Sequence, residues 1–274
     1  MLKPPYTFYE HLYVYHLDLP HIPKVNDPDL IGVWMEDDTA VLFFHREKDA
    51  LIKDICKVNK CELIYQADLS YQDWESGQNI TGFTIDSLRI APVWDNAPAD
   101  IRIDPSVIFG SGFHPTTRTC LELLLKYLTT PEIKIKNVLD LGAGTGLLSI
   151  AAAHLGAEQV SAIDNNNLAC QVAGANCRLN NVEDRVTVRQ QDLLKQPPDT
   201  GGSDLIIANL YRGLLQELFS LPAFWEGGLY ILSGFIQPME ADLLADLPSS
   251  RIRFLERKRK DRWCVWVLAN RDIL

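Results

Sequence analysis

Apolar and polar positions follow two different rhythms along this chain of 274 residues. In the first part, residues 11–19 and 39–45 alternate as strands do, and residues 61–69 are compatible with a further strand. Residues 47–59 instead have the spacing of a helix. The apolar residues that we place on one side of this helix are Ala50, Leu51, Ile55 and Val58. We therefore predict a small N-terminal α+β domain over residues 1–76.

A polar stretch at residues 71–78, YQDWESGQ, separates this domain from the rest of the chain. It ends in Gly77 and polar residues, a composition typical of a linker. We therefore expect a hinge near residues 71–80, with a second domain over residues 77–274.

The second domain begins with two apolar stretches, residues 82–94 and 99–104, which are predicted to pair as strands. A loop rich in glycine and proline follows, DPSVIFGSGFHPTT. Residues 117–128 then have the spacing of an amphipathic helix. Thr116 or Thr117 is a natural N-cap for that helix, because a threonine hydroxyl can accept a free N–H of the first turn.

Beyond this helix, strand and helix patterns alternate. The predicted strands are residues 137–141, 159–164, 185–192, 203–210 and 227–235, and the predicted helices are residues 145–156, 166–180, 212–225 and 238–247. Such alternation predicts a parallel sheet with helices on both faces. The last two strands, residues 252–260 and 262–270, have no helix between them and must pair antiparallel. The predicted fold class is α/β, with a seven-stranded Rossmann-like sheet whose last strand is antiparallel.

The stretch VLDLGAGTG at residues 138–146 places Gly142, Gly144 and Gly146 between a predicted strand and a predicted helix. Glycine permits positive φ and close approach of a ligand, and the helix N-terminus offers free N–H groups. A dinucleotide site would have the spacing G-x-G-x-x-G, whereas this loop has G-x-G-x-G. Asp140, two residues before the first glycine, suits a ligand with a positive group, such as an ammonium or a sulfonium, better than a pyrophosphate.

Two further aspartates end the next predicted strands, at the edge where open α/β sheets bind ligands. Asp164 could take both hydroxyls of a ribose, and Asp192 could accept from an adenine amine. Together with Asp140 and the three glycines, these residues indicate S-adenosylmethionine rather than NAD. The alternative is that they are ordinary turn residues.

Two polar residues nearby have more than one interpretation. Asn209 ends the fourth predicted strand, which lies beside the bound methyl group in this architecture, or it is a plain turn asparagine. His114 lies in the loop before the first helix and is either functional or a structural histidine. The basic run RFLERKRKDR near the C-terminus is best explained as a solvated face of the terminal hairpin.

Composition and charge narrow the class of protein. Hydrophobic residues make up 47% and charged residues 23% of the chain, which favours a folded domain over disorder. The net charge of −10 and the pI of about 5.1 argue against a general nucleic-acid binder, so no direct nucleic-acid binding is expected. They fit an acidic enzyme with a basic protein substrate, although many cytosolic proteins are acidic for no such reason.

No signal-peptide pattern stands at the N-terminus, and no run of about eighteen apolar residues occurs. We therefore expect a cytoplasmic protein without a membrane partner, and a monomer. The six cysteines form no C-x-x-C pair. Buried free thiols are the interpretation that we favour over a zinc site at Cys56 and Cys61, and no metal is expected.

The loop before the first helix carries a more specific motif. Residues 109–117 read F-G-S-G-F-H-P-T-T, which resembles the F-G-x-G-x-H-P-T-T run of the PrmA family, the methyltransferases of large-subunit ribosomal protein 11. The segments DWE at 73–75, LSG at 232–234 and WC at 263–264 also resemble the family. The resemblance extends from about residue 72 to residue 270.

This resemblance implies methylation of lysine ε-amines and an N-terminal α-amine of the ribosomal protein, which a separate N-terminal domain would grip. In the family the loop folds over the cofactor and forms one wall of the substrate site, and its threonines can donate to the cofactor carboxylate. The candidates for holding the acceptor amine or for catalysis are Asn209, His114 and Phe109. The candidates for binding the cofactor are Thr116, Thr117, Asp140, Gly142, Ala143, Gly144, Gly146, Asp164, Asn165, Asp192 and Asn209.

The chain departs from the family pattern at Ser111 and Phe113, where threonine is usual, and at Leu210 and Tyr211, where the family reads I-L. These departures leave room for a paralogue that methylates another protein or a small amine. A third alternative is a non-catalytic module that binds the cofactor or a ribosomal partner, and the intact cofactor motifs count against it. We expect Phe113 and Tyr211 to line and narrow the mouth where the acceptor amine enters.

Overall fold

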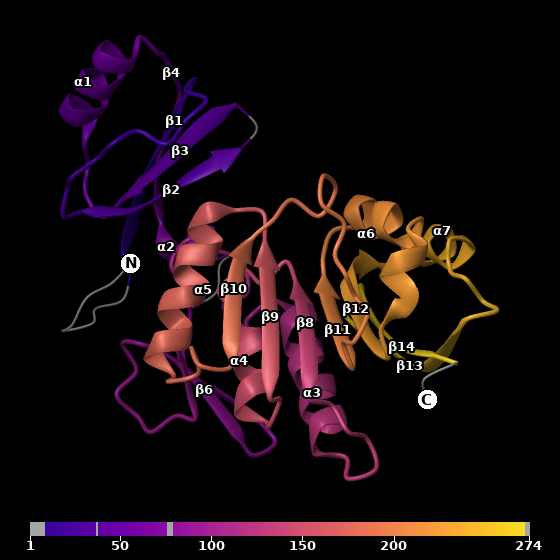
Figure 1. Ribbon diagram of the computed structural model, residues 1–274. Coiled ribbons are helices and arrows are strands. Elements are labelled where there is room, and N and C mark those ends of the chain that lie inside the picture. Colours follow the sequence, from indigo (N-terminus) through magenta and orange to yellow (C-terminus); the bar gives the residue numbers. More distant parts are fainter. Residues whose placement is uncertain (1–8, 37, 76–78, 272–274) are drawn as a thin grey trace.

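The structure is a computed structural model that describes residues 9–36, 38–75 and 79–271 (Figure 1). It contains a four-stranded sheet, a seven-stranded sheet and a small three-stranded sheet. The predicted hinge near residues 71–80 includes residues 76–78, which lie outside the described residues. Over the described ranges, no helix combines the length and the apolar character needed to span a bilayer.

The N-terminal domain is an antiparallel sheet of order β2-β3-β1-β4 with one helix packed on it (Figure 1). Its elements are β1 (His11–Leu17), β2 (Leu30–Glu36), β3 (Thr39–Phe44), α1 (Asp49–Asn59) and β4 (Leu63–Ser70). Strand β2 was missed by the sequence analysis, because Gly32 and a register shift between Leu30 and Gly32 interrupt its apolar pattern.

Helix α1 packs on this sheet through Ile52 and Ile55, in an apolar cluster with Leu42 and Phe44. The predicted apolar side was therefore only partly right, since Ile55 is buried whereas the side chain of Val58 is 79% exposed. The helix continues to Asn59 and ends where Lys60 takes a left-handed φ of 54°.

Between the two main sheets, the chain forms a short helix and a small sheet. The predicted linker begins as α2 (Tyr71–Trp74), whose N-cap Ser70 accepts the N–H of Asp73. The small sheet has the order β5-β6-β7, with β5 (Phe83–Ile85), β6 (Leu88–Pro92) and β7 (Ile101–Ile103). The single strand predicted over residues 82–94 is instead a hairpin that turns at Asp86, where φ is 49°.

The large sheet has the order β10-β9-β8-β11-β12-β14-β13. Its strands are β8 (Asn137–Leu141), β9 (Gln159–Asp164), β10 (Val186–Gln190), β11 (Leu205–Asn209), β12 (Leu229–Ile236), β13 (Ile252–Lys260) and β14 (Trp263–Asn270). Strand β14 pairs antiparallel with both β12 and β13, and the pairings among β8–β12 are parallel. The predicted seven-stranded α/β sheet with an antiparallel last strand is confirmed.

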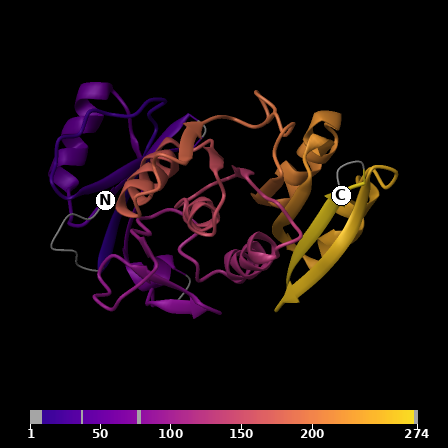
Figure 2. The same cartoon turned by 60° about the horizontal axis from the view of Figure 1, so that its bottom comes forward.

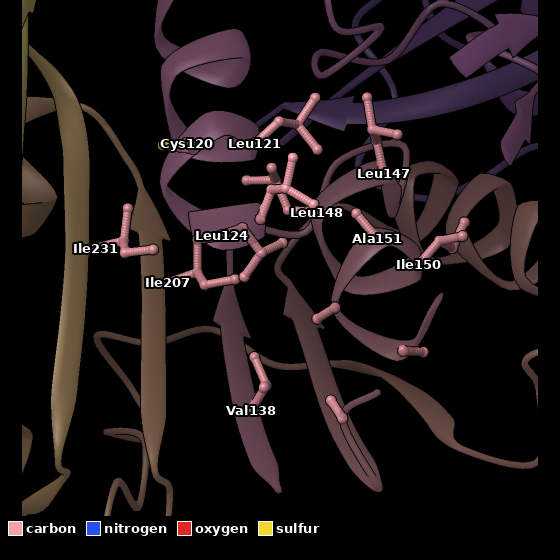
Figure 3. Packing of buried hydrophobic residues seen from close by; sticks show 14 of the residues in the cluster. Cys120, Leu121, Leu124, Val138, Leu147, Leu148, Ile150, Ala151, Ile207 and Ile231 are labelled. Atoms are coloured by element: carbon pink, nitrogen blue, oxygen red, sulfur yellow. The ribbon is translucent and has the colours of Figure 1, made fainter. Parts of the chain in front are cut away.

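Helices cover both faces of the large sheet. They are α3 (Pro115–Thr129), α4 (Leu147–His154), α5 (Asn167–Leu179), α6 (Arg212–Phe219) and α7 (Glu240–Ala245), with short 3₁₀ turns at Pro222–Glu226 and Gln237–Met239. One apolar cluster joins α3 and α4 to the sheet, and Figure 3 shows Leu124, Leu148 and Ile207 together in it. A second cluster packs α6 and α7 against the other face through Leu215, Leu218 and Leu243.

The N-terminal domain lies beside α5 at the β10 edge, and the β13–β14 hairpin lies at the opposite edge (Figures 1 and 2). Leu168 and Val172 of α5 share an apolar cluster with Ile31 and Phe43 of the N-terminal sheet. A Cβ on Gly32 would stand 2.4 Å from Leu168 Cδ1, so the glycine lets β2 approach the helix closely. This packing brings β2 to the carboxyl edge of the large sheet.

Candidate active site

A cavity of about 450 Å³ opens at the carboxyl ends of the central strands. Strand β8 pairs with β9 on one side and with β11 on the other, so the strand order reverses there. Such a switch point is the usual ligand site of an open α/β sheet, and the volume is typical of a small-molecule site. The candidate residues from the sequence that line it are Phe109, Gly142, Gly144, Asp164, Asn165, Asp192 and Asn209.

The loop after β8 needs its glycines for conformation and for close approach. Gly142 and Gly144 have positive φ values of 77° and 55°. The N–H of Gly144 donates to Asp164 Oδ2 at 2.9 Å. A Cβ on Gly144 would lie 2.3 Å from the carbonyl oxygen of Phe109, so a side chain at residue 144 would collide with backbone.

Asp164 ends β9 and faces the cavity. Its Oδ1 accepts the N–H of Asn166 at 2.8 Å, while Oδ2 accepts that of Gly144. Each carboxylate oxygen retains a further lone pair for a ligand. Burial raises the pKa of Asp164, and the backbone donors oppose that rise. The side chain is therefore held in place with its remaining acceptors available to hydroxyl groups.

Asp192 lies two residues beyond β10 rather than at its end. Its Oδ1 accepts the N–H of Leu194 at 3.0 Å, and its Oδ2 lies 3.2 Å from Lys195 Nζ. The Leu194 N–H and then Lys195 hold the pKa of this carboxyl below its usual range. Asp192 thus fixes the turn beside the cavity, and its contact with an adenine amine stays a prediction.

The loop of residues 109–117 is tied to the glycine loop through Thr145. The N–H of Thr145 donates to the carbonyl of Phe109 at 3.1 Å, and its hydroxyl donates to the carbonyl of Gly110 at 2.7 Å. The Phe109 side chain is 55% exposed and lines the cavity. The two glycine-rich loops therefore form one rim of the site.

Over residues 29–271, the chain matches the family described as ribosomal protein L11 methyltransferase (PrmA). The chain belongs to the PrmA family. The match includes most of the N-terminal sheet, from the first residues of β2 onward, as well as the whole large sheet.

Individual relatives agree with this assignment. A ribosomal protein L11 methyltransferase of Carboxydothermus hydrogenoformans is 37% identical over 187 residues, which cover 65% of this chain and 59% of the relative. A ribosomal protein L11 methyltransferase of Dictyoglomus turgidum is 33% identical over 230 residues, which cover 81% of this chain and 74% of the relative. The chain thus spans less than two thirds of the first of these relatives.

A solved structure supports the shared architecture. The ribosomal protein L11 methylase of Lactobacillus delbrueckii subsp. bulgaricus aligns with a TM-score of 0.59 and 26% identity. The alignment covers 69% of this chain and 98% of that one. The fold is therefore that of a Rossmann-like methyltransferase with a small additional sheet domain.

In this PrmA family member, His114 is the N-cap of α3, and the prediction of Thr116 or Thr117 as the cap was wrong. The N–H of Thr116 donates to His114 Nδ1 at 3.3 Å, which leaves the ring hydrogen of a neutral imidazole on Nε2. Burial, then Arg262, lowers the pKa of His114. The ring packs against Phe109 and Trp263 with centroids 5.2 and 4.6 Å away. Its position favours a structural role, although it also lines a second cavity.

Several predicted cofactor contacts lie beneath the cavity wall rather than in it. Asp140 is buried, and its Oδ2 accepts the hydroxyl of Ser149 at 2.6 Å. Burial raises the pKa of Asp140 to about 6. The other candidates that do not line the cavity are Thr116, Thr117, Ala143 and Gly146. A direct contact of any of these five with the cofactor stays a prediction.

Two of these residues have evident packing or hydrogen-bonding partners. Gly146 has a φ of 81°, and a Cβ there would lie 3.0 Å from that of Ala173 on α5. The hydroxyl of Thr117 accepts Asn209 Nδ2 at 3.5 Å. Asn209 itself ends β11 and lines the cavity. Thr117, which does not line the cavity, thus helps to orient a side chain that does.

A second cavity of about 200 Å³ adjoins the first and shares Trp34, Ile108 and Phe109 with it. Its other lining residues are Trp74, Glu75, Val107, Gly110, Ser111, Phe113 and His114. Sequence reasoning missed Trp34 and Glu75. Trp34 was hidden in the unrecognised strand β2, whereas Glu75 stood in the DWE segment and could have been singled out there.

The cysteines are free, with Cys120, Cys177 and Cys264 buried and Cys56, Cys61 and Cys170 partly buried. Within the described ranges, the structure contains no group of three or more histidine, cysteine or acidic side chains that could hold a metal ion.

Proposed function

We propose that this protein transfers the methyl group of S-adenosylmethionine to ribosomal protein L11, acting on lysine ε-amines and on the N-terminal α-amine. The observation that carries the proposal is the loop of residues 109–117, which contains the family motif and is called the signature loop below. Phe109 and Gly110 of this loop are hydrogen-bonded to the glycine loop at the rim of the cavity. Membership of the PrmA family supports the same substrate, because the curated relatives are named ribosomal protein L11 methyltransferases.

The residues at the cavity fit S-adenosylmethionine. Asp164 lines the cavity, and each of its carboxylate oxygens keeps a further lone pair that could accept a hydroxyl group of a ribose diol. Gly142 and Gly144 present bare backbone beside it, which permits close approach of the ligand. When bound, the cofactor would supply a methyl group activated by a sulfonium. The apolar wall formed by Leu193, Leu210 and Leu214 suits the flat face of an adenine.

The chain's own residues would position and desolvate the acceptor amine. A lysine amine has a pKa near 10.4, so its neutral form costs about 4–5 kcal/mol at pH 7 in water. A pocket that excludes water lowers this cost, because burial disfavours the ammonium form. Asn209 and the backbone of the signature loop are the candidates for orienting the nitrogen, and the main contribution is orientation.

The proposed partner suits the charge of the chain. The net charge of −10 favours encounter with a basic protein such as a ribosomal protein. In this proposal the N-terminal sheet grips the ribosomal protein, and the enzyme acts as a cytoplasmic monomer. The position of Trp34 on β2, at both cavities, gives that sheet a direct link to the site.

The test uses purified ribosomal protein L11, isotope-labelled S-adenosylmethionine and mass spectrometry of the product. We expect label on lysine ε-amines and on the N-terminal residue. D164A should lose cofactor binding in calorimetry and should lose methylation. D184A, which changes an exposed aspartate two residues before β10, at the amino end of that strand, should behave as wild type. Tight cofactor binding without label on the ribosomal protein would refute the substrate and leave the cofactor assignment intact.

A further inference from the structure

The second cavity combines aromatic walls with one carboxylate. Trp34, Trp74 and Phe109 contribute ring faces or edges, and Glu75 contributes its carboxyl group. Ring faces attract ammonium groups, and a carboxylate pairs with them. Because the cavity shares Trp34 and Phe109 with the proposed cofactor cavity, a side chain that occupies it ends beside the cofactor.

Glu75 is partly buried, and its hydrogen-bond partners are neutral hydroxyl groups. Ser111 donates its hydroxyl to Glu75 Oε2 at 3.0 Å, and the Tyr71 hydroxyl lies 3.3 Å from Oε1. In the ranges that the structure describes, Glu75 forms no ion pair with lysine, arginine or histidine. Burial raises the pKa of this carboxyl, while the hydroxyl of Ser111 opposes the rise.

The Tyr71 hydroxyl is only a weak hydrogen-bond donor to Glu75 Oε1. This hydroxyl has a single hydrogen, and the backbone carbonyl of Ser106 lies 2.6 Å away, nearer than Glu75 Oε1. The shorter contact takes that hydrogen. Among the residues that the structure describes, Oε1 is therefore left without a good donor, and a ligand with N–H groups can supply one.

We propose that the second cavity is the subsite for the acceptor amine and that the carboxylate of Glu75 binds its ammonium group. This inference rests on the proposed function, since it supplies that reaction with its second substrate. The ligand class is an unbranched primary alkylammonium, whose chain would lie against the indoles of Trp34 and Trp74 that line the cavity. Glu75 is then a specificity-determining residue that selects an amine over a neutral side chain.

The same carboxylate can prepare the amine for attack. A proton moves from the ammonium nitrogen to Glu75 Oε1, so that an N–H bond breaks, an O–H bond forms and the nitrogen keeps the electron pair. A carboxyl group with a raised pKa lowers the cost of this transfer relative to an ordinary glutamate. His114 at the same cavity is a weak acceptor for this proton, because its Nδ1 already accepts the N–H of Thr116 and burial lowers its pKa.

The experiment measures binding of n-butylammonium, a lysine side-chain analogue, and of neutral 1-butanol, by tryptophan fluorescence without cofactor. Trp34 and Trp74 at the cavity report occupancy. We expect the wild type to prefer the amine by about tenfold or more, as a charge-assisted hydrogen bond provides. E75Q should lose most of this preference. E132Q, an exposed glutamate in the loop before β8, should keep it.

Several outcomes overturn the subsite: no binding of n-butylammonium to the wild type, no preference over 1-butanol, or an unchanged preference in E75Q. Calorimetry with S-adenosylmethionine checks that E75Q is folded. If ribosomal protein L11 is methylated and E75Q keeps the wild-type preference, the subsite fails and the proposed function stands. If L11 is not methylated but the preference depends on Glu75, the subsite stands and the proposed substrate fails.

The pH dependence provides a further readout of Glu75. Tyr71, Glu75 and His114 are the titratable groups that face this cavity or its carboxylate, and Arg262 lies near His114. Binding of n-butylammonium should weaken as the pH falls and Glu75 takes up a proton. Protonation of His114 acts in the same direction, so the part of the pH dependence that E75Q removes belongs to Glu75.

Discussion

The carbonyl oxygen of Phe109 lies 2.3 Å from the point where a Cβ on Gly144 would stand. The signature loop and the glycine loop thus approach so closely that the side chain of residue 144 has space for only the hydrogen atom of a glycine. The N–H of Thr145 closes the contact by donating to the same oxygen at 3.1 Å. Both loops line the proposed cofactor cavity, so a disturbance at this point reaches both walls of it.

The first prediction concerns G144A. The sequence suggested that this glycine permits close approach of a ligand, whereas the structure shows that the nearest obstacle to a side chain at residue 144 is the backbone of Phe109. We expect affinity for S-adenosylmethionine in calorimetry to fall by about tenfold or more, because the loops must separate by roughly 0.7 Å merely to bring the 2.3 Å contact to 3.0 Å. Affinity within twofold of wild type in a folded G144A would be the contrary result.

G202A is the matched control for that variant. Gly202 also has a positive φ, 79°, but a Cβ there meets nothing within 4 Å. Both variants should lose about 1 kcal/mol of unfolding free energy from the left-handed backbone. Only G144A should also lose cofactor affinity, and the difference between the two variants isolates the collision with Phe109.

The fold was predicted well because the βα rhythm of residues 137–270 is regular and local. The strands and helices there have clear apolar periods, and the glycine loop marks the first turn of the sheet. The N-terminal sheet was harder, because β2 is short and contains Gly32, whose purpose is visible only in its contact with Leu168 on α5. A contact between residues so far apart in sequence leaves no local pattern.

The sequence predicted which residues stand near the carboxyl ends of strands. It did not predict which of them face the cavity and which are buried behind it. Asp164 and Asp140 both stand at the carboxyl ends of strands, but only Asp164 faces the cavity. Helix α4 covers Asp140 and supplies the hydroxyl of Ser149. Sequence spacing does not reveal which carboxylate a helix covers. It likewise hid the second cavity, which forms from β2, α2 and the signature loop together.

The second prediction concerns the domain division. A fragment of residues 79–271 contains the whole large sheet together with Asp164 and the glycine loop. We expect limited proteolysis near residues 71–80 to release it as a stable product that still binds S-adenosylmethionine. Loss of Trp34 and exposure of Leu168 should reduce its affinity and solubility, but not abolish binding. A folded fragment with no measurable affinity would show that the N-terminal sheet is part of the cofactor site.

The third prediction concerns Asp140 and stability. Its pKa is raised by burial from 3.8 to about 6, so the folded state binds more protons than the unfolded state between these values. Stability from this group is full below pH 3.8 and is lost as the pH rises through 6. At pH 8 the ionised carboxylate then costs about 3 kcal/mol.

D140N removes that charge while its amide oxygen can still accept the Ser149 hydroxyl. We expect urea unfolding to show a gain of about 1–3 kcal/mol over wild type at pH 8, and a smaller gain at pH 5. D184N, at an exposed position, should show neither gain. A loss of stability at pH 8 would mean that the charge is compensated inside the protein. Calorimetry on D140N also tests whether Asp140 contacts the cofactor.

The two aromatic departures from the family pattern do not form one narrow mouth. Tyr211 lines the first cavity and is 65% exposed, whereas Phe113 lines the second. The Phe113 ring packs edge to face on Phe83 at 5.5 Å, and the guanidinium of Arg118 lies 5.2 Å from it. The expectation that both residues line one entrance was therefore wrong. Tyr211 lines the proposed cofactor cavity, and Phe113 lines the proposed amine subsite.

The last prediction separates these roles with Y211L and F113T, which restore the residues usual in the family. Y211L should raise the methylation rate of purified ribosomal protein L11 relative to wild type, because Tyr211 lines the first cavity together with Asn209, the candidate for orienting the acceptor nitrogen. It should leave cofactor affinity within about twofold, because an exposed ring adds little to ligand binding. F113T should lose about 1–3 kcal/mol of stability through the Phe83 contact and should widen the second cavity. Initial rates with L11 and urea unfolding of each variant measure both effects. If the wild type already methylates L11 at a rate typical of an enzyme on its own substrate and Y211L does not increase it, Tyr211 does not restrict the acceptor, and this chain acts as an ordinary member of the PrmA family.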